Sequence, residues 1–168
     1  MAKKSDGAAL AIIGQLVEKF TEHRETYHRP SYNETQLRQG FLDPFFTALG
    51  WEVTNRQGFA EAYRDVILEQ ALRVEKSVKA PDYCFRIGVT RKFFVEAKKP
   101  AVDIKRDVSP AFQLRRYART AKLPLSILTD FKEFVVDDCR VKPKRQSCSM
   151  LVRTVPIGEH LDTMPMIQ

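Results

Sequence analysis

The chain has 168 residues, 43% of them hydrophobic and 29% charged, which suits a single globular domain with one core. No apolar run approaches the roughly 20 residues that cross a bilayer, so the sequence predicts no membrane-spanning segment. The 28 Lys and Arg residues exceed the 21 Asp and Glu residues, and the formal net charge of +7 favours a polyanionic partner.

The three cysteines, Cys84, Cys139 and Cys148, give no sign of a disulfide framework. Their number is odd, none lies in a CxxC motif, and the three histidines are not spaced from them as zinc ligands would be. We expect reduced thiols in a cytosolic protein.

Two amphipathic helices are expected in the first third of the chain. Apolar residues recur at helical spacing over residues 8–20, which predicts the first helix. Asn33 with Gln36 three residues later forms a capping-box pattern, which predicts the start of the second. Pro44 lies inside the apolar pattern of that helix and should kink or divide it near Gly40.

The region between the second helix and residue 80 is harder to interpret. Gly50 is well placed to end the helix, and Trp51–Val53 is predicted as a short strand. The apolar residues between 66 and 74 fit either a helix or a strand followed by a loop, and both alternatives remain open.

The second half of the chain is predicted to be rich in strands. Tyr83–Ile87 and Lys92–Ala97 should form a hairpin through a turn at Gly88. A helix from Ser109-Pro110 to about Ala121 and two more strands follow, at Leu125–Leu128 and Glu133–Val136. This order predicts an α/β fold with a mixed β-sheet flanked by helices.

Two acids and a lysine fall at the open end of the predicted hairpin. Asp82 precedes its first strand, and Glu96-Ala97-Lys98 closes the second, 14 positions later (96 − 82). The hairpin would bring Asp82 beside Glu96. Alternate side chains of a strand share a face, so Glu96 and Lys98 should point the same way and Ala97 the opposite way.

This combination fits metal-assisted phosphodiester cleavage. Mg²⁺ takes oxygen ligands, commonly one or two carboxylates with waters and phosphate oxygens, and it activates a bound water. A nearby lysine can orient that water or stabilise developing negative charge. The pattern alone is loose, however, and a surface strand with ordinary charges would also produce it.

Five segments in a fixed order make the pattern more specific. The first segment comprises Asn33–Arg38, Phe41–Pro44 and Leu49–Trp51. The other four are Pro81–Tyr83, Phe94–Pro100, Gln113–Ala118 and Ile127–Phe131. From Asn33 to Asp138 the chain resembles the N-terminal PD-(D/E)xK nuclease domain of single-chain (type IIG) restriction-modification enzymes and of type I restriction motor subunits.

The resemblance implies a restriction-endonuclease-like core that hydrolyses double-stranded DNA with Mg²⁺, for which Mn²⁺ is a possible substitute. Asp82 and Glu96 match the metal-binding acids, the Ala97 backbone carbonyl is a further ligand, and Lys98 matches the catalytic lysine. The role it implies is restriction of foreign DNA.

Three auxiliary residues also match by resemblance. Glu34 matches an acid on an early helix that approaches the metal directly or through water, although a helix N-terminal acid favoured by the dipole fits equally well. Gln113 and Tyr117 match a QxxxY motif and lie one helical turn apart. They position the site or contact DNA, unless Tyr117 is simply core and Gln113 exposed.

Four basic residues of the same predicted helix are candidates for DNA contact: Arg115, Arg116, Arg119 and Lys122. A solvated helix face is the alternative, because Arg119 and Lys122 need not face the same way.

Residues 1–140 are assigned to the nuclease domain, and residues 141–168 to a peripheral segment or the stump of a linker in a longer enzyme. The sequence contains no cofactor motif for S-adenosylmethionine, so the resemblance places methyltransferase and target-recognition domains outside this chain. A double-strand break suggests two such domains acting together, for example as a transient homodimer. A catalytically silent DNA-binding or assembly module of the same fold remains an alternative, and a carboxylate-pair enzyme such as a glycosidase is a third reading.

Overall fold

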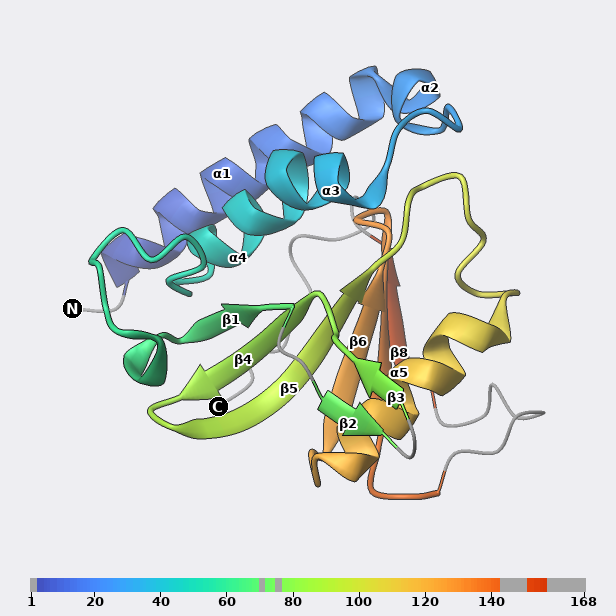
Figure 1. Ribbon diagram of the computed structural model, residues 1–168. Helices are drawn as coiled ribbons and strands as arrows, with labels where there is room; N and C mark the ends of the chain where they lie inside the picture. The colour runs from blue at the N-terminus through green and yellow to red at the C-terminus, as the bar shows by residue number, and fades with distance from the viewer. Residues whose placement is uncertain (1–2, 70–71, 75–76, 143–150, 157–168) are drawn as a thin grey trace.

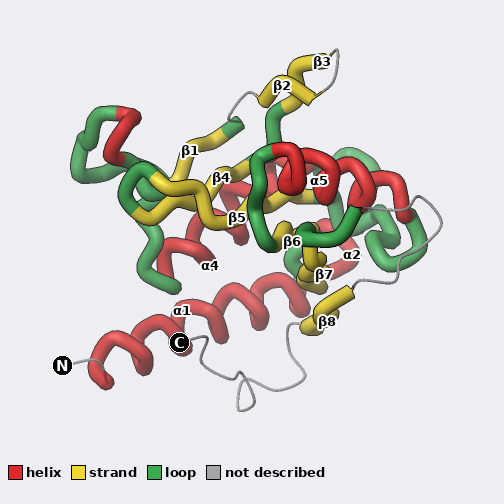
Figure 2. Tube along the Cα trace, turned by 90° about the horizontal axis from the view of Figure 1, so that it is seen from below, coloured by secondary structure: helices red, strands yellow, loops and turns green. Residues whose placement is uncertain are grey.

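A six-stranded β-sheet lies between two layers of helices in the computed structural model, which describes residues 3–69, 72–74, 77–142 and 151–156. Its strand order is β1-β4-β5-β6-β7-β8, with β5 and β6 parallel and the other neighbours antiparallel. In Figure 2, α1 and α5 lie on opposite sides of the central strands. This confirms the predicted α/β fold, which is consistent with a restriction-endonuclease-like core.

The helical layer on the first face is continuous in sequence (Figure 1). It consists of α1 (Lys3–Glu22), α2 (Arg24–Tyr27), α3 (Glu34–Leu37), the π-helical η1 (Arg38–Leu42) and α4 (Asp43–Ala48). The predicted capping box is present, since Asn33 and Gln36 each accept the other's backbone N–H at 2.9 Å. The predicted division near Gly40 takes the form of the π-helical turn, and Pro44 lies in the first turn of α4.

The sheet comprises β1 (Val66–Leu68), β4 (Tyr83–Ile87), β5 (Thr90–Ala97), β6 (Leu125–Thr129), β7 (Glu133–Asp138) and β8 (Leu151–Pro156). A small second sheet pairs β2 (Leu72–Val74) with β3 (Ser77–Lys79), and η2 (Glu61–Tyr63) is a short 3-10 turn. α5 (Val108–Thr120) covers the other face. The predicted hairpin, third helix and last two strands are therefore confirmed, and β8 adds an edge strand within the segment 141–168.

Residues 51–53 do not form the predicted strand. The N–H of Val53 bonds to the carbonyl of Trp51 at 3.1 Å, a tight local turn that extended backbone cannot make. The indole of Trp51 instead packs edge-on against Phe85, with the ring centroids 5.0 Å apart. Of the two alternatives for residues 66–74, the strand is correct, and the chain enters the sheet as β1.

Each face of the sheet has its own core. On the α1 and α4 side, Phe41 contacts Phe20, Tyr27 and Phe131, with centroid separations of 5.2, 4.9 and 4.9 Å. Phe131 reaches this cluster from the turn between β6 and β7, with a positive φ of 67°. Burial of its ring offsets this unfavourable backbone conformation. On the other side, buried apolar residues of α5 cover the opposite face of β4, β5 and β6.

Cys84 and Cys139 are buried free thiols, as expected, and Cys148 lies outside the described residues. None of the helices in the described ranges combines the length and apolar character needed to cross a membrane.

Replacing Phe41 by alanine tests the aromatic core. Its side chain is 1% exposed, so Phe41→Ala should lower the free energy of unfolding by about 3–5 kcal/mol, through lost burial and the cavity left behind. Phe59, 44% exposed, is the matched control, and Phe59→Ala should change that energy by about 0.5 kcal/mol or less. Urea denaturation measures both, and equal losses would contradict this view of the core.

Candidate active site

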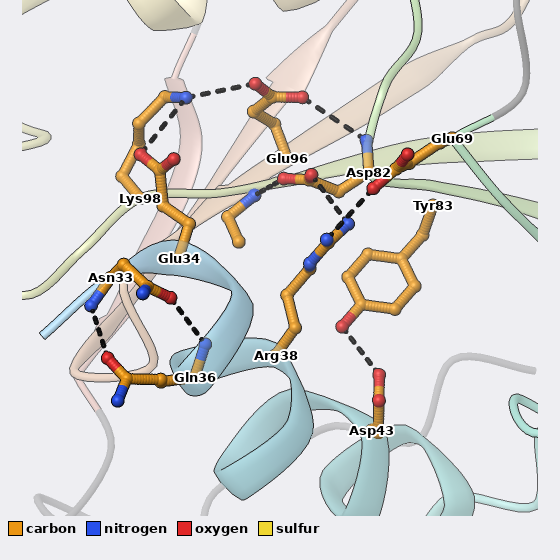
Figure 3. A network of polar contacts seen from close by, with 11 residues as sticks. Asn33, Glu34, Gln36, Arg38, Asp43, Glu69, Asp82, Tyr83, Glu96 and Lys98 are labelled. Carbon is orange, nitrogen blue, oxygen red and sulfur yellow. Dashed lines mark hydrogen bonds and ion pairs between the residues drawn. The ribbon is translucent and has the colours of Figure 1, made fainter.

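The register of the β4–β5 hairpin sets Asp82 beside Glu96. Tyr83 pairs with Val95, so the next positions toward the open end of the hairpin are Asp82 and Glu96. Two backbone donors fix them there (Figure 3). The N–H of Ala97 donates to Asp82 Oδ2 at 2.7 Å, and the N–H of Asp82 donates to Glu96 Oε2 at 3.4 Å. Each acid is thus held by the backbone of the opposite strand.

Two cations bind the other oxygens of these acids. Arg38 Nη1 donates to Asp82 Oδ1 at 2.9 Å, and Lys98 Nζ donates to Glu96 Oε1 at 3.0 Å. The contact between Lys98 and Glu96 agrees with the predicted alternation along the strand. The side chains of Asp82 and Glu96 are 20% and 22% exposed, so solvent and ligands still reach them.

Two further acids complete the group. Glu34 Oε1 lies 3.6 Å from Lys98 Nζ, and Glu69 Oε1 lies 3.0 Å from Arg38 Nη2. We call the six connected residues the ion-pair cluster: Glu34, Arg38, Glu69, Asp82, Glu96 and Lys98. Its four carboxylates at −1 and two cations at +1 give a formal charge of −2. The structure thus brings Glu34 to the predicted site, where it contacts Lys98.

Burial and charge shift the pKa values within the cluster. Burial raises the pKa of the Asp82 carboxyl, although its bonds to Ala97 and Arg38 oppose the rise. Burial and the neighbouring Asp82 charge raise the pKa of Glu96. Burial disfavours the charged form of Lys98, but its acidic neighbours outweigh this and its pKa is raised. Lys98 is therefore a protonated ammonium at neutral pH, suited to stabilising negative charge.

The helix α5 brings Tyr117 and Gln113 toward the same region. The Tyr117 hydroxyl donates to Gln113 Oε1 at 3.5 Å, so the two share a face as predicted. Burial raises the pKa of Tyr117, and the charge of Glu96 adds to the rise. Tyr117 is buried in the α5 core and Gln113 is exposed, which is the arrangement expected of the alternative in which Tyr117 is core and Gln113 solvated.

The four basic residues predicted for DNA contact do not form one patch. The prediction that Arg115 contacts DNA is wrong, because Arg115 is only 6% exposed and its Nη1 lies 3.8 Å from Asp137 Oδ1 inside the protein. Arg116 lies over the ring of Phe112, 5.8 Å from its centroid. Arg119 and Lys122 do face the same way, and both line a cavity of about 350 Å³ that Arg140 also lines.

Sequence reasoning missed two members of the cluster, Arg38 and Glu69. A signal for Arg38 was available, because it follows Glu34 by four positions and so shares its helix face. Glu69 had no such signal. It follows β1 with a positive φ of 50°, and its N–H bonds to the carbonyl of Asp82 at 3.0 Å, a contact that only the fold creates.

The donor set suits a hard divalent cation. Two adjacent carboxylates offer oxygen ligands, and the formal charge of −2 on the cluster matches one divalent ion. Across the described part of the chain, no group of three or more His, Cys, Asp or Glu side chains could hold a metal ion. A cation held by Asp82 and Glu96 would therefore also need backbone, water or substrate oxygens.

The chain is similar to part of a restriction enzyme. Over 129 residues, 76% of its length, it is 46% identical to the "Type II restriction enzyme and methyltransferase RM.Eco57I" of Escherichia coli. The chain spans 13% of the length of that protein. No protein-family profile matches it, and no solved structure matches it. This similarity relates the chain to one segment of a restriction and modification enzyme.

Replacing Glu96 by glutamine tests whether the buried charge of Glu96 lowers the stability of the folded protein. Because the folded-state pKa of Glu96 is raised, folding favours its protonated form, and stability falls as the pH rises through that pKa. Glu96→Gln cannot titrate. Its thermal midpoint should therefore exceed that of the wild type by a few degrees at neutral pH, and this gap should shrink in acid.

Thermal unfolding from pH 4 to pH 8 without divalent ions measures the gap. Glu18→Gln, at an exposed glutamate of α1, is the matched control for the loss of one carboxylate, and its thermal midpoint at neutral pH should stay close to that of the wild type. A Glu96→Gln gap that narrows as the pH rises would contradict the raised pKa.

Proposed function

We propose that the chain is a magnesium-dependent endonuclease domain of the PD-(D/E)xK class, which hydrolyses phosphodiester bonds of DNA in restriction. The observation that supports this most is the convergence of Asp82, Glu96 and Lys98 at one end of the β4–β5 hairpin. The similarity to a restriction enzyme and methyltransferase, and the net charge of +7, support DNA as the substrate.

Asp82 and Glu96 would hold the metal, with the Ala97 carbonyl as a third oxygen ligand. When bound, Mg²⁺ polarises the scissile phosphate and lowers the pKa of the attacking water. The two backbone N–H donors keep both carboxylates in place, so little reorganisation is needed at the moment of reaction. The Lys98 ammonium donates to the attacking water or to the phosphate oxygen that gains charge.

The outer residues of the site serve the same reaction. The Glu34 carboxylate lies 3.6 Å from the Lys98 ammonium, and this ion pair limits the positions that the ammonium can take. Gln113, which is exposed and bonded to Tyr117, would donate its amide to the DNA backbone. Arg116 and Arg119 on α5, and Lys122 directly after it, add positive charge, and Arg115 is removed from this set.

The partners follow from the same proposal. Double-stranded DNA is the substrate, and Mn²⁺ can replace Mg²⁺. The name of the relative includes a methyltransferase, and such a domain would act with this nuclease. A separate target-recognition domain would select the DNA sequence. One site cuts one strand, so two copies acting transiently together would make a double-strand break.

Plasmid cleavage with Mg²⁺ or Mn²⁺ tests the proposal. Lys98→Ala should lower the cleavage rate by roughly 10²- to 10³-fold, the usual cost of removing one group that stabilises transition-state charge. Asp82→Ala should abolish cleavage because it removes a metal ligand. Lys99→Ala is the matched control, since this neighbouring lysine is outside the ion-pair cluster, and it should cut at about the wild-type rate.

Circular dichroism of each variant separates lost chemistry from lost fold. Wild-type protein that binds neither Mg²⁺ nor Mn²⁺ in calorimetry and leaves plasmid intact would reject the proposal in favour of a silent module. Equal rates for Lys98→Ala and Lys99→Ala would reject the assigned site.

A further inference from the structure

Arg38 belongs to the ion-pair cluster but has no role in the reaction proposed above. Its guanidinium is 16% exposed and joins two acids from different segments, through Nη1 to Asp82 at 2.9 Å and through Nη2 to Glu69 at 3.0 Å (Figure 3). Arg38 is also the first residue of the π-helical turn η1, and such turns are frequent at functional sites.

Asp82 is held at each of its polar atoms. Its N–H donates to Glu96, its carbonyl accepts from Glu69, and its two carboxylate oxygens accept from Arg38 and Ala97. The terminal torsion of an aspartate is soft and roughly two-fold, so a single bond to Oδ2 would leave the carboxylate free to turn. The second bond, from Arg38, fixes the plane of the carboxylate.

Glu69 in turn holds Arg38. It keeps a positive φ of 50°, a conformation that residues other than glycine, asparagine and aspartate rarely adopt. Its N–H is fixed on the Asp82 carbonyl, and its side chain carries the other end of the guanidinium. A lysine at position 38 could not make both contacts in this way, because an ammonium lacks the planar fork of two donors.

We propose that Arg38 is a positioning residue for the divalent cation: with Glu69 as its anchor, it sets the orientation of the Asp82 carboxylate that receives the metal. This inference rests on the proposed function. Arg38 does not touch the reacting atoms. It acts through Asp82, as hydrogen-bonded partners of metal-ligating carboxylates do elsewhere.

Titration calorimetry of the intact chain with Mg²⁺ or Mn²⁺ alone, without DNA, tests this role. Arg38→Lys and Arg38→Gln should raise the dissociation constant roughly 10- to 100-fold while the fold is retained. Glu69→Gln should raise it less, because the guanidinium keeps its bond to Asp82. Arg106→Lys is the matched control, since Arg106 is 90% exposed and pairs with Asp103, and it should bind metal as the wild type does.

Cleavage as a function of metal concentration gives a second readout. The Arg38→Lys defect should disappear at saturating metal, whereas the Lys98→Ala defect should persist, because only the first is a defect of metal affinity. A purely structural role for Arg38 would lower the thermal midpoint and leave the metal dissociation constant unchanged.

The outcomes separate the two proposals. If the wild type binds metal and Arg38→Lys binds it equally well, the positioning role is overturned and the proposed function stands. Tighter binding by Arg38→Gln would also overturn it, because Arg38 would then act as a competing charge. If the wild type binds no metal, the proposed function fails and this inference fails with it.

Discussion

The site depends on two backbone N–H groups at the open end of the β4–β5 hairpin. Beyond the pair Tyr83–Val95 the strand ladder ends, and the N–H groups of Asp82 and Ala97 take carboxylate oxygens as partners. Backbone donors at a strand end need partners in any case, and carboxylates accept from them strongly. The register therefore satisfies two donors and brings two like charges together at once. A one-residue shift in the register of the hairpin would turn these side chains to the opposite face and separate the two carboxylates.

The rest of the molecule offsets the cost of this arrangement. Four carboxylates with two cations leave the ion-pair cluster at a formal charge of −2, and burial raises the pKa values of Asp82 and Glu96. Such a group opposes folding in the absence of a counter-ion. The buried aromatic residues on the α1 and α4 side of the sheet supply the opposite contribution. Phe41 follows Arg38 on the same helical segment and packs into the core. One turn therefore both anchors the helical layer to the sheet and brings the Arg38 guanidinium to Asp82.

The sequence was enough to predict what depends on local pattern. Alternation and the turn at Gly88 predicted the hairpin, and hence the pairing of Asp82 with Glu96. Helix periodicity placed Gln113 and Tyr117 on one face. The prediction of DNA contact for Arg115 was wrong, because helix periodicity cannot show that the buried Asp137 on β7 pairs with its guanidinium. Glu69 could not be predicted either, since its role comes from a positive φ and from contacts with Asp82 and Arg38, which lie far away in the sequence.

Arg38 illustrates how a short-range pattern and a long-range contact combine. Its spacing from Glu34 places both residues on one helix face, yet they bind opposite partners, Glu34 to Lys98 and Arg38 to Asp82. One helical turn thus presents a carboxylate to Lys98 and a guanidinium cation to Asp82, the complement of the charges on the hairpin. This complementarity orients α3 and η1 against the end of the sheet. It also couples the geometry of the carboxylates to the packing of a helical segment. A movement of η1 would displace the Arg38 guanidinium and so change the orientation of the Asp82 carboxylate.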